Sequence, residues 1–170
     1  MSRRSRGFPP IAAPDARVLI LGSLPGQVSL ARQQYYAQPQ NAFWKIMDVL
    51  FGAGPALAYE DRIERLVASR LAVWDVLAAG ERSGSLDSAI VATNMVINDF
   101  GGFFERHGEL GLICFNGAKA ASLYRRRVLP FLPPRVAAIE QRVLPSTSPA
   151  NASVSFASKL ERWSAALAVR

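Results

Sequence analysis

A short aliphatic run that stops at a glycine constrains the fold of this chain more than any other feature. Val18–Leu21 is apolar throughout and is followed directly by Gly22-Ser23-Leu24-Pro25-Gly26. A continuous apolar run of this length is typical of a parallel strand that is buried on both faces. A glycine-bearing loop after such a strand places backbone N–H groups at the carboxyl edge of a sheet, where open α/β sheets bind ligands.

Strand-like and helix-like segments alternate along the rest of the chain. Further strands are predicted over residues 71–77, ending at Asp75 or just beyond, and over residues 112–115 and 141–144. Helical spacing and capping residues predict helices over residues 42–51, 59–69, 99–106, 118–127 and 156–169. The Gly/Ser-rich residues 79–88 are expected to form a loop. This alternation predicts an α/β fold, a sandwich of helices around a short parallel sheet.

The chain length of 170 residues suits one domain with its own core. Residues 1–16 are expected to form a basic, loosely tied N-terminal arm, because Pro9, Pro10 and Pro14 forbid a regular helix there. Residues 17–170 would then form the single domain. No apolar run reaches about 18 residues, so no membrane span is predicted. The N-terminus lacks the apolar core of a signal peptide, and we expect a cytoplasmic protein.

The net charge of +7 favours a polyanionic partner, although an arginine-rich composition alone could produce it. Between Lys119 and Arg142 there are six basic residues against a single acid, Glu140. Cys114 and His107 are the only residues of their types. One cysteine and one histidine cannot supply a structural zinc site, an iron–sulfur cluster or a disulfide framework. We therefore expect no metal and no cofactor.

Two loops carry residues suited to chemistry. The first loop lacks the Gly-Lys-Ser/Thr of a Walker loop and the third glycine of a dinucleotide fingerprint. It continues into a polar stretch with Tyr35-Tyr36 and several amide side chains. Aromatic faces stack on bases and amides read base edges, but the two tyrosines could equally be packing residues. The second loop, residues 144–152, reads LPSTSPANA, and its hydroxyl groups suit contact with phosphates or a plain helix cap.

The segments GSLPG, QQYYAQPQNAFW, WDV and LPSTSPANA, in that order, resemble motifs of the uracil-DNA glycosylase superfamily. The hypoxanthine-DNA glycosylase branch is the most similar, and the resemblance extends from Val18 to about Trp163. It implies a three-layer α/β/α sandwich with a four-stranded parallel sheet and a DNA groove across the carboxyl ends of the strands. It also implies a flipped deaminated base whose N-glycosidic bond is hydrolysed without a metal.

The resemblance assigns roles to individual residues. Gly22, Ser23 and Gly26 would form the loop that contacts the flipped base, with Leu24 inside it. Tyr36 matches the aromatic residue that stacks on the base. Asp75 matches a base-reading position, where it would accept from N1–H of hypoxanthine or donate if protonated; a cap of the following turn is the alternative. The residues that match the loop pinching the DNA phosphates are Ser146, Thr147 and Ser148, with Asn151 supporting that loop.

Departures from the family pattern bear on the reaction. Relatives that act on uracil place an Asp or Asn in the first loop to activate water, and Leu24 stands there instead. Asn41 is the candidate for positioning the water, with Gln38 second. Leu144 stands where strong uracil enzymes often carry His. These changes indicate that the protein is not an efficient uracil enzyme and favour hypoxanthine as the base that it removes. Uracil and xanthine are possible further substrates.

The predicted function is a monofunctional DNA glycosylase that leaves an abasic site in base excision repair. It is expected to act as a monomer on DNA that contains deaminated bases. No lysine is placed for Schiff-base chemistry. The alternative is a module of the same fold that binds damaged DNA with little or no turnover, because the water-activating residue is replaced. A third and weaker hypothesis is a hydrolase of free nucleosides.

Overall fold

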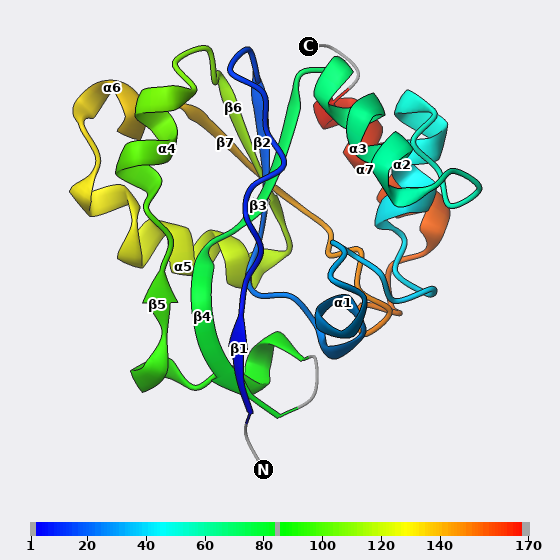
Figure 1. Cartoon of the computed structure of the whole chain (residues 1–170), viewed down its shortest axis with the longest axis horizontal. Coiled ribbons are helices and arrows are strands. Elements are labelled where there is room, and N and C mark those ends of the chain that lie inside the picture. Colours follow the sequence, from blue (N-terminus) through cyan, green and yellow to red (C-terminus); the bar gives the residue numbers. More distant parts are fainter. Residues whose placement is uncertain (1–2, 84–85, 168–170) are drawn as a thin grey trace.

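The computed structural model describes residues 3–83 and 86–167 of the chain. Its centre is a four-stranded parallel sheet in the order β3-β2-β6-β7 (Figure 1). Every residue of β2, β3 and β6 is buried, as expected for parallel strands that are covered on both faces. The strands of this sheet are β2 (Val18–Gly22), β3 (Leu71–Asp75), β6 (Leu112–Asn116) and β7 (Glu140–Leu144).

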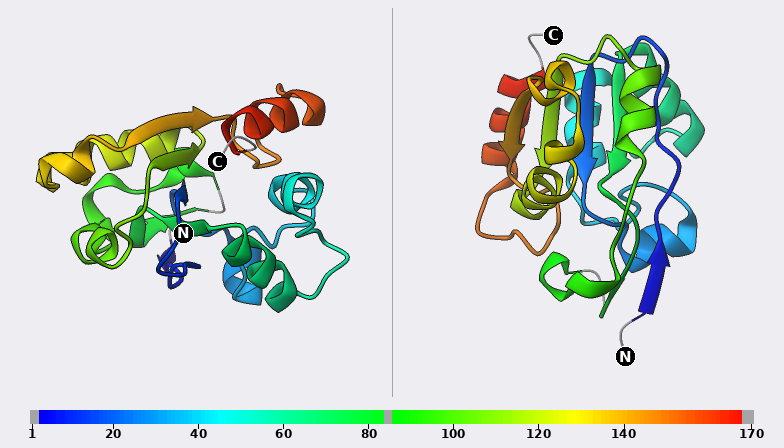
Figure 2. Two further views of the ribbon diagram at one scale, coloured as in Figure 1. Left: turned by 90° about the horizontal axis from the view of Figure 1, so that it is seen from above. Right: turned by 90° about the vertical axis from the view of Figure 1, so that its left-hand side faces the viewer.

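Helices cover both faces of this sheet, and the two further views in Figure 2 show the same layers. Val18 and Ile20 pack into one apolar cluster, and Leu19 and Leu21 pack into the other, because successive strand residues point to opposite faces. The helices on the Ile20 side are α2 (Phe43–Phe51), α3 (Tyr59–Ala68) and α7 (Phe156–Leu167). Those on the Leu19 side are α4 (Phe100–Arg106), α5 (Ala118–Arg127) and α6 (Pro134–Ala137). The predicted α/β sandwich is confirmed.

A second, antiparallel sheet in the order β1-β4-β5 was not predicted. Its central strand lies in the segment expected to be a loop, because pairing on both sides outweighs the weak strand propensity of its glycine and alanines. A short helix also occupies part of the expected loop after Gly26, and α6 was likewise not predicted. The other elements outside the predicted set are β1 (Arg3–Arg6), α1 (Gln27–Arg32), β4 (Leu77–Arg82), β5 (Val96–Ile97) and the 3₁₀ turns η1 (Asp87–Ala89), η2 (Ala92–Asn94) and η3 (Leu129–Phe131).

The N-terminal segment is part of the fold, and the expectation of a loosely tied arm is wrong for residues 3–16. Strand β1 pairs with β4, and Ile11 exchanges backbone hydrogen bonds of 2.9 and 2.8 Å with Val73 of β3. Ile11 and Ala16 are both buried. Prolines exclude a helix, but the residues between them remain free to pair in an extended conformation. In the described residues, no helix combines the length and apolarity needed to cross a bilayer.

Ile11→Ala provides a test of this packing. We expect the free energy of unfolding to fall by about 2–5 kcal/mol, as for other large-to-small changes at buried aliphatic positions. Urea denaturation followed by circular dichroism measures the loss. Asp15→Asn is the matched control in the same segment, because it alters only an exposed ion pair with Arg70 and should cost less than about 1 kcal/mol. Equal stabilities of wild type and Ile11→Ala would mean that the segment is not anchored.

Candidate functional site

A cavity of about 850 Å³ opens at the carboxyl ends of the parallel strands. The loop after β2, the loop after β7 and the turn η1 contribute to its walls. All the residues that the resemblance singled out line this one cavity, although they come from distant parts of the chain. They are Gly22, Ser23, Leu24, Gly26, Tyr36, Gln38, Asn41, Asp75, Ser146, Thr147, Ser148 and Asn151.

The loop after β2 is held against the segment that follows β3. The carbonyl of Gly22 accepts from the N–H of Val76 at 2.9 Å, and the carbonyl of Ser23 accepts from Leu77 at 3.1 Å. A Cβ at Gly22 would lie 2.5 Å from Oδ1 of Asp75 and 3.0 Å from the Tyr36 hydroxyl. Only glycine leaves room for both groups, so this residue permits the close approach of two polar side chains to the backbone.

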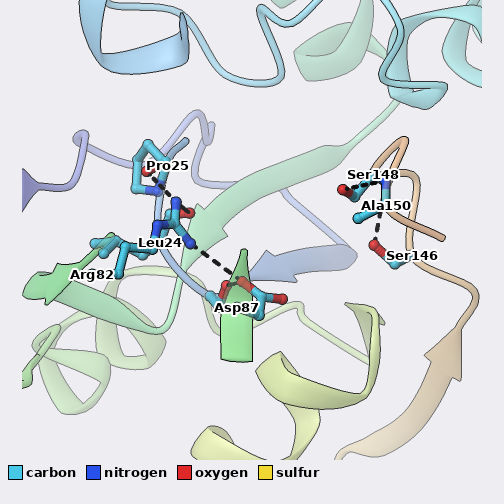
Figure 3. A network of polar contacts seen from close by, with 8 residues as sticks. Leu24, Pro25, Arg82, Asp87, Ser146, Ser148 and Ala150 are labelled. Atoms are coloured by element: carbon cyan, nitrogen blue, oxygen red, sulfur yellow. Dashed lines mark hydrogen bonds and ion pairs between the residues drawn. The ribbon is translucent and has the colours of Figure 1, made fainter. Parts of the chain in front are cut away.

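Arg82, which no sequence pattern indicated, anchors the first loop from strand β4. Its side chain is 1% exposed, and its Nη2 donates to the carbonyls of Leu24 at 2.9 Å and Pro25 at 2.5 Å (Figure 3). Its Nη1 lies 3.4 Å from Oδ1 of Asp87, which also accepts a 2.5 Å hydrogen bond from Oγ of Ser23. Burial lowers the pKa of Arg82, and the nearby carboxylates oppose that shift. No local pattern marks Arg82 or Asp87, because strand β4 was itself not predicted.

Asp75 and Tyr36 each place a buried polar atom without a partner at the cavity. Within the described residues, Oδ2 of Asp75 and the hydroxyl of Tyr36 have no hydrogen-bond partner. Burial raises the pKa of Asp75 to about 7, with Asp87 adding to the shift and Arg82 opposing it. The side chain of Asn98 caps the following turn by donating to the Asp75 carbonyl at 2.8 Å. No backbone N–H of the described residues donates to the Asp75 carboxyl group, so this group does not cap the turn and remains available to a ligand.

The two tyrosines have different environments. Both line the cavity, but Tyr35 is buried and its hydroxyl donates to the carbonyl of Pro9 at 2.8 Å, so Tyr35 is mainly a packing residue. Tyr36 lines the cavity, and its ring stacks on Phe43 with 4.1 Å between the ring centroids. The backbone φ angle of Tyr36 is +52°, a value that residues other than glycine rarely adopt. This strained backbone keeps the ring at the cavity wall.

The side-chain oxygen atoms of both amides predicted to position water already accept hydrogen bonds. Oδ1 of Asn41 accepts from the N–H of Phe43 at 2.9 Å, which caps the start of α2. Oε1 of Gln38 accepts from the N–H of Gln40. The amide nitrogen of Asn41 has no hydrogen bond to any of the described residues and can donate. These amides are therefore better suited to donating hydrogen bonds than to accepting a proton.

The loop after β7 is rigid because several elements anchor it. Asn116 and Thr147 form a reciprocal pair, with Nδ2 of Asn116 donating to Oγ1 of Thr147 and the N–H of Thr147 donating back, both at 2.9 Å. The carbonyl of Thr147 accepts from Ala42 at 2.9 Å, which joins this loop to the first one. Nδ2 of Asn151 donates to the Ser146 carbonyl at 3.2 Å. Ser146 and Ser148 remain partly exposed at the cavity.

The basic cluster between Lys119 and Arg142 does not line the cavity. Arg142 instead pairs with Glu140 at 2.8 Å, and Arg125 donates to Gln141 at 3.0 Å. The cations along the described cavity wall are Arg82 and Arg162. These arginines therefore lie away from the cavity although they are close to the second loop in the sequence.

The fold and the cavity define an α/β protein with a deep cavity at the carboxyl edge of a parallel sheet, the edge at which open α/β sheets bind ligands. The family model for the uracil DNA glycosylase superfamily matches residues 9–168. The chain belongs to this superfamily, as the resemblance predicted.

Individual relatives agree with that membership. A protein of Methanosarcina acetivorans described as hypoxanthine DNA glycosylase is 43% identical over 147 residues, which covers 86% of this chain and 87% of that protein. A protein of Methanosarcina barkeri with the same description is 35% identical over 164 residues, which covers 96% and 98% of the two chains. An NMR structure from M. acetivorans, provisionally described as a uracil DNA glycosylase, has a TM-score of 0.80 and 39% identity over 97% of both chains.

The raised pKa of Asp75 predicts a pH-dependent stability. The folded pKa of about 7 lies above the ordinary value of 3.8, so the free energy of unfolding should fall as pH rises from about 4 to about 7. Asp75→Asn removes this dependence and should be more stable than wild type at pH 8 by up to a few kcal/mol, at about 1.4 kcal/mol per pKa unit. Chemical denaturation at pH 5 and pH 8 measures the difference.

The exposed substitution Glu64→Gln is the control for removing a carboxylate. It should shift stability by the same small amount at both pH values, because its charge is solvated. A difference between wild type and Asp75→Asn that stays constant from pH 5 to pH 8 would contradict a raised pKa.

Proposed function

We propose that this protein is a monofunctional DNA glycosylase that releases hypoxanthine from DNA and leaves an abasic site. The observation that carries the proposal is the convergence of both motif loops on one cavity at the carboxyl edge of the sheet. Superfamily membership and the two relatives described as hypoxanthine DNA glycosylase support the same activity. The net charge of +7 suits a polyanionic substrate.

In this proposal the damaged base leaves the helix and enters the cavity beside Tyr36, which stacks on it. Hypoxanthine presents a carbonyl oxygen, O6, next to N1–H. Asp75 reads this edge, donating to O6 when protonated and accepting from N1–H when ionised. A pKa near 7 makes both forms accessible at neutral pH. The donating form also stabilises negative charge that develops on the departing base.

Ser146 and Ser148 bind the DNA phosphates, and their partial exposure supports this role. Thr147 contributes differently, because it is 1% exposed and both its hydroxyl and its N–H are bound to Asn116. It therefore shapes the loop. Asn151 supports the loop through its contact with the Ser146 carbonyl.

Hydrolysis passes through a sugar with oxocarbenium character, so the protein mainly orients a water molecule and stabilises the leaving base. Asn41 holds the water by donating from its amide nitrogen, with Gln38 as the second candidate. The described cavity wall contains no lysine, which supports hydrolysis without a Schiff-base intermediate. The monomeric state and the cytoplasmic location remain predictions.

A cleavage panel tests the activity. Oligonucleotides that contain one deoxyinosine, deoxyuridine or deoxyxanthosine are incubated with the protein, and abasic sites are cleaved with alkali. We expect strand breaks with deoxyinosine and slower or no cleavage with deoxyuridine. Binding of the inosine oligonucleotide without any cleavage would favour the binding-module alternative. Release of hypoxanthine from free deoxyinosine at the same rate would favour a nucleoside hydrolase.

Asn41→Ser tests the role of the amide. Serine can still accept from the N–H of Phe43 and cap α2, so the variant removes the amide while the helix start is preserved. We expect the single-turnover rate on the inosine oligonucleotide to fall by about 10²-fold. Gln34→Ala, which changes an amide outside the cavity wall, is the control and should keep the wild-type rate. A wild-type rate for Asn41→Ser would remove Asn41 from the mechanism.

A further inference from the structure

The first loop contributes no acid to the cavity, because Leu24 stands at its centre. Leu24 is 6% exposed and belongs to the apolar cluster on the α4 and α5 side of the sheet. A Cβ at Gly80 of β4 would lie 3.4 Å from Cδ2 of Leu24, so the leucine packs closely against that strand. A water molecule at the sugar therefore needs a proton acceptor from another element.

The amide candidates do not supply that acceptor, because Oδ1 of Asn41 and Oε1 of Gln38 both accept from backbone N–H groups. The described residues of the cavity wall include no histidine and only two carboxylates, Asp75 and Asp87. Asp75 is 4% exposed and lies at the base of the site beside Gly22. Asp87 is 40% exposed at its side chain, so water can reach it.

The surroundings of Asp87 hold its carboxylate beside the first loop. Its Oδ1 accepts from Oγ of Ser23 and faces the guanidinium of Arg82. Arg82 is itself fixed by the carbonyls of Leu24 and Pro25, as Figure 3 shows. One oxygen of Asp87 is thus bound, which sets the orientation of the carboxylate, and no hydrogen bond from the described residues reaches its second oxygen, Oδ2. A preset carboxylate with one free oxygen is the arrangement that a general base requires.

We propose that Asp87 is a further catalytic residue and that its carboxylate orients and deprotonates the attacking water. This inference rests on the proposed glycosylase function. The water oxygen forms a bond to C1′ as the C1′–N9 bond breaks, and the bonding electron pair leaves with the base. A proton of the water passes to Asp87, and the base takes up a proton from solvent or from Asp75. Turn η1 thus supplies the carboxylate that the first loop lacks because Leu24 stands there.

Asp87→Asn is the central test, because asparagine keeps the shape and an oxygen for Ser23 but cannot take a proton. We expect the single-turnover rate on the inosine oligonucleotide to fall by about 10²-fold to 10⁴-fold. Binding of an abasic oligonucleotide, the reaction product, should change by less than about three-fold, because phosphate contacts dominate affinity. A rate within about three-fold of wild type would overturn the proposal.

Chemical rescue distinguishes proton transfer from a structural role. Asp87→Ala opens space for a small carboxylate, and added formate should raise its rate by at least about ten-fold, while chloride at equal ionic strength should not. A merely structural Asp87 would give weaker binding of the abasic oligonucleotide, and formate, by pairing with Arg82, would restore this binding without raising the single-turnover rate at saturating protein. That result would also overturn the proposal.

Two variants complete the comparison. Asp15→Asn, the matched control, removes a carboxylate that pairs with an arginine away from the cavity, and it should keep the wild-type rate. Asp87→Glu keeps a negative charge opposite Arg82, so the ion pair is preserved and this variant should fold even if Asp87→Asn does not. Moving the carboxylate by one methylene should lower the rate at least about ten-fold with unchanged binding, and a wild-type rate would count against Asp87.

The outcomes for this inference and for the proposed function are separable. If wild-type protein releases hypoxanthine and the Asp87 variants match it, only the role of Asp87 fails. If wild-type protein releases no base from any of the three substrates, the glycosylase function fails and the role of Asp87 fails with it.

Discussion

The site depends on one buried cation, the guanidinium of Arg82. It comes from a strand of the antiparallel sheet, yet two of its hydrogen bonds go to carbonyls of the loop after β2. An unpaired charge at this depth would be costly, and the carboxylate of Asp87 offsets that cost. Because Asp87 also binds Ser23, one ion pair fixes the first loop and turn η1 relative to each other. The second sheet is therefore a structural support for the cavity.

The opposite wall is held mainly by neutral hydrogen bonds, together with one buried cation, Lys159 of α7, whose Nζ donates to the Ser148 carbonyl at 3.4 Å. The reciprocal pair of Asn116 and Thr147 connects the end of β6 with the loop after β7, and the Thr147 carbonyl connects that loop with the start of α2. Buried amide and hydroxyl groups that satisfy each other stiffen the loop. A rigid frame of this kind suits the recognition of an extrahelical base, because little loop entropy is lost on binding.

Unsatisfied polar atoms mark the part of the cavity where a ligand is expected. Oδ2 of Asp75 and the hydroxyl of Tyr36 are buried without partners within the described residues. Such atoms cost stability, and sites that bind polar ligands carry this cost because the ligand supplies the missing hydrogen bonds. The positive φ of Tyr36 adds backbone strain at the same place. Strain and unpaired groups lie together at the floor of the cavity, beside Gly22.

The sequence by itself determined the parallel sheet and the two motif loops, because continuous apolar runs such as Val18–Leu21 can be satisfied only by burial on both faces. The family resemblance of those loops singled out residues that line the cavity, and they lie together because the loops follow strands whose carboxyl ends meet at one edge. Only the tertiary structure decided that the N-terminal segment pairs with β4, that Arg82 and Asp87 join the site, and that the oxygen of Asn41 is occupied. The first two features depend on contacts between residues far apart in the chain, such as β1 with β4 and Arg82 with Leu24, and no local pattern encodes such contacts. The Asn41 contact is local, two residues from Phe43, but the sequence does not say whether this side chain caps the helix or faces the cavity.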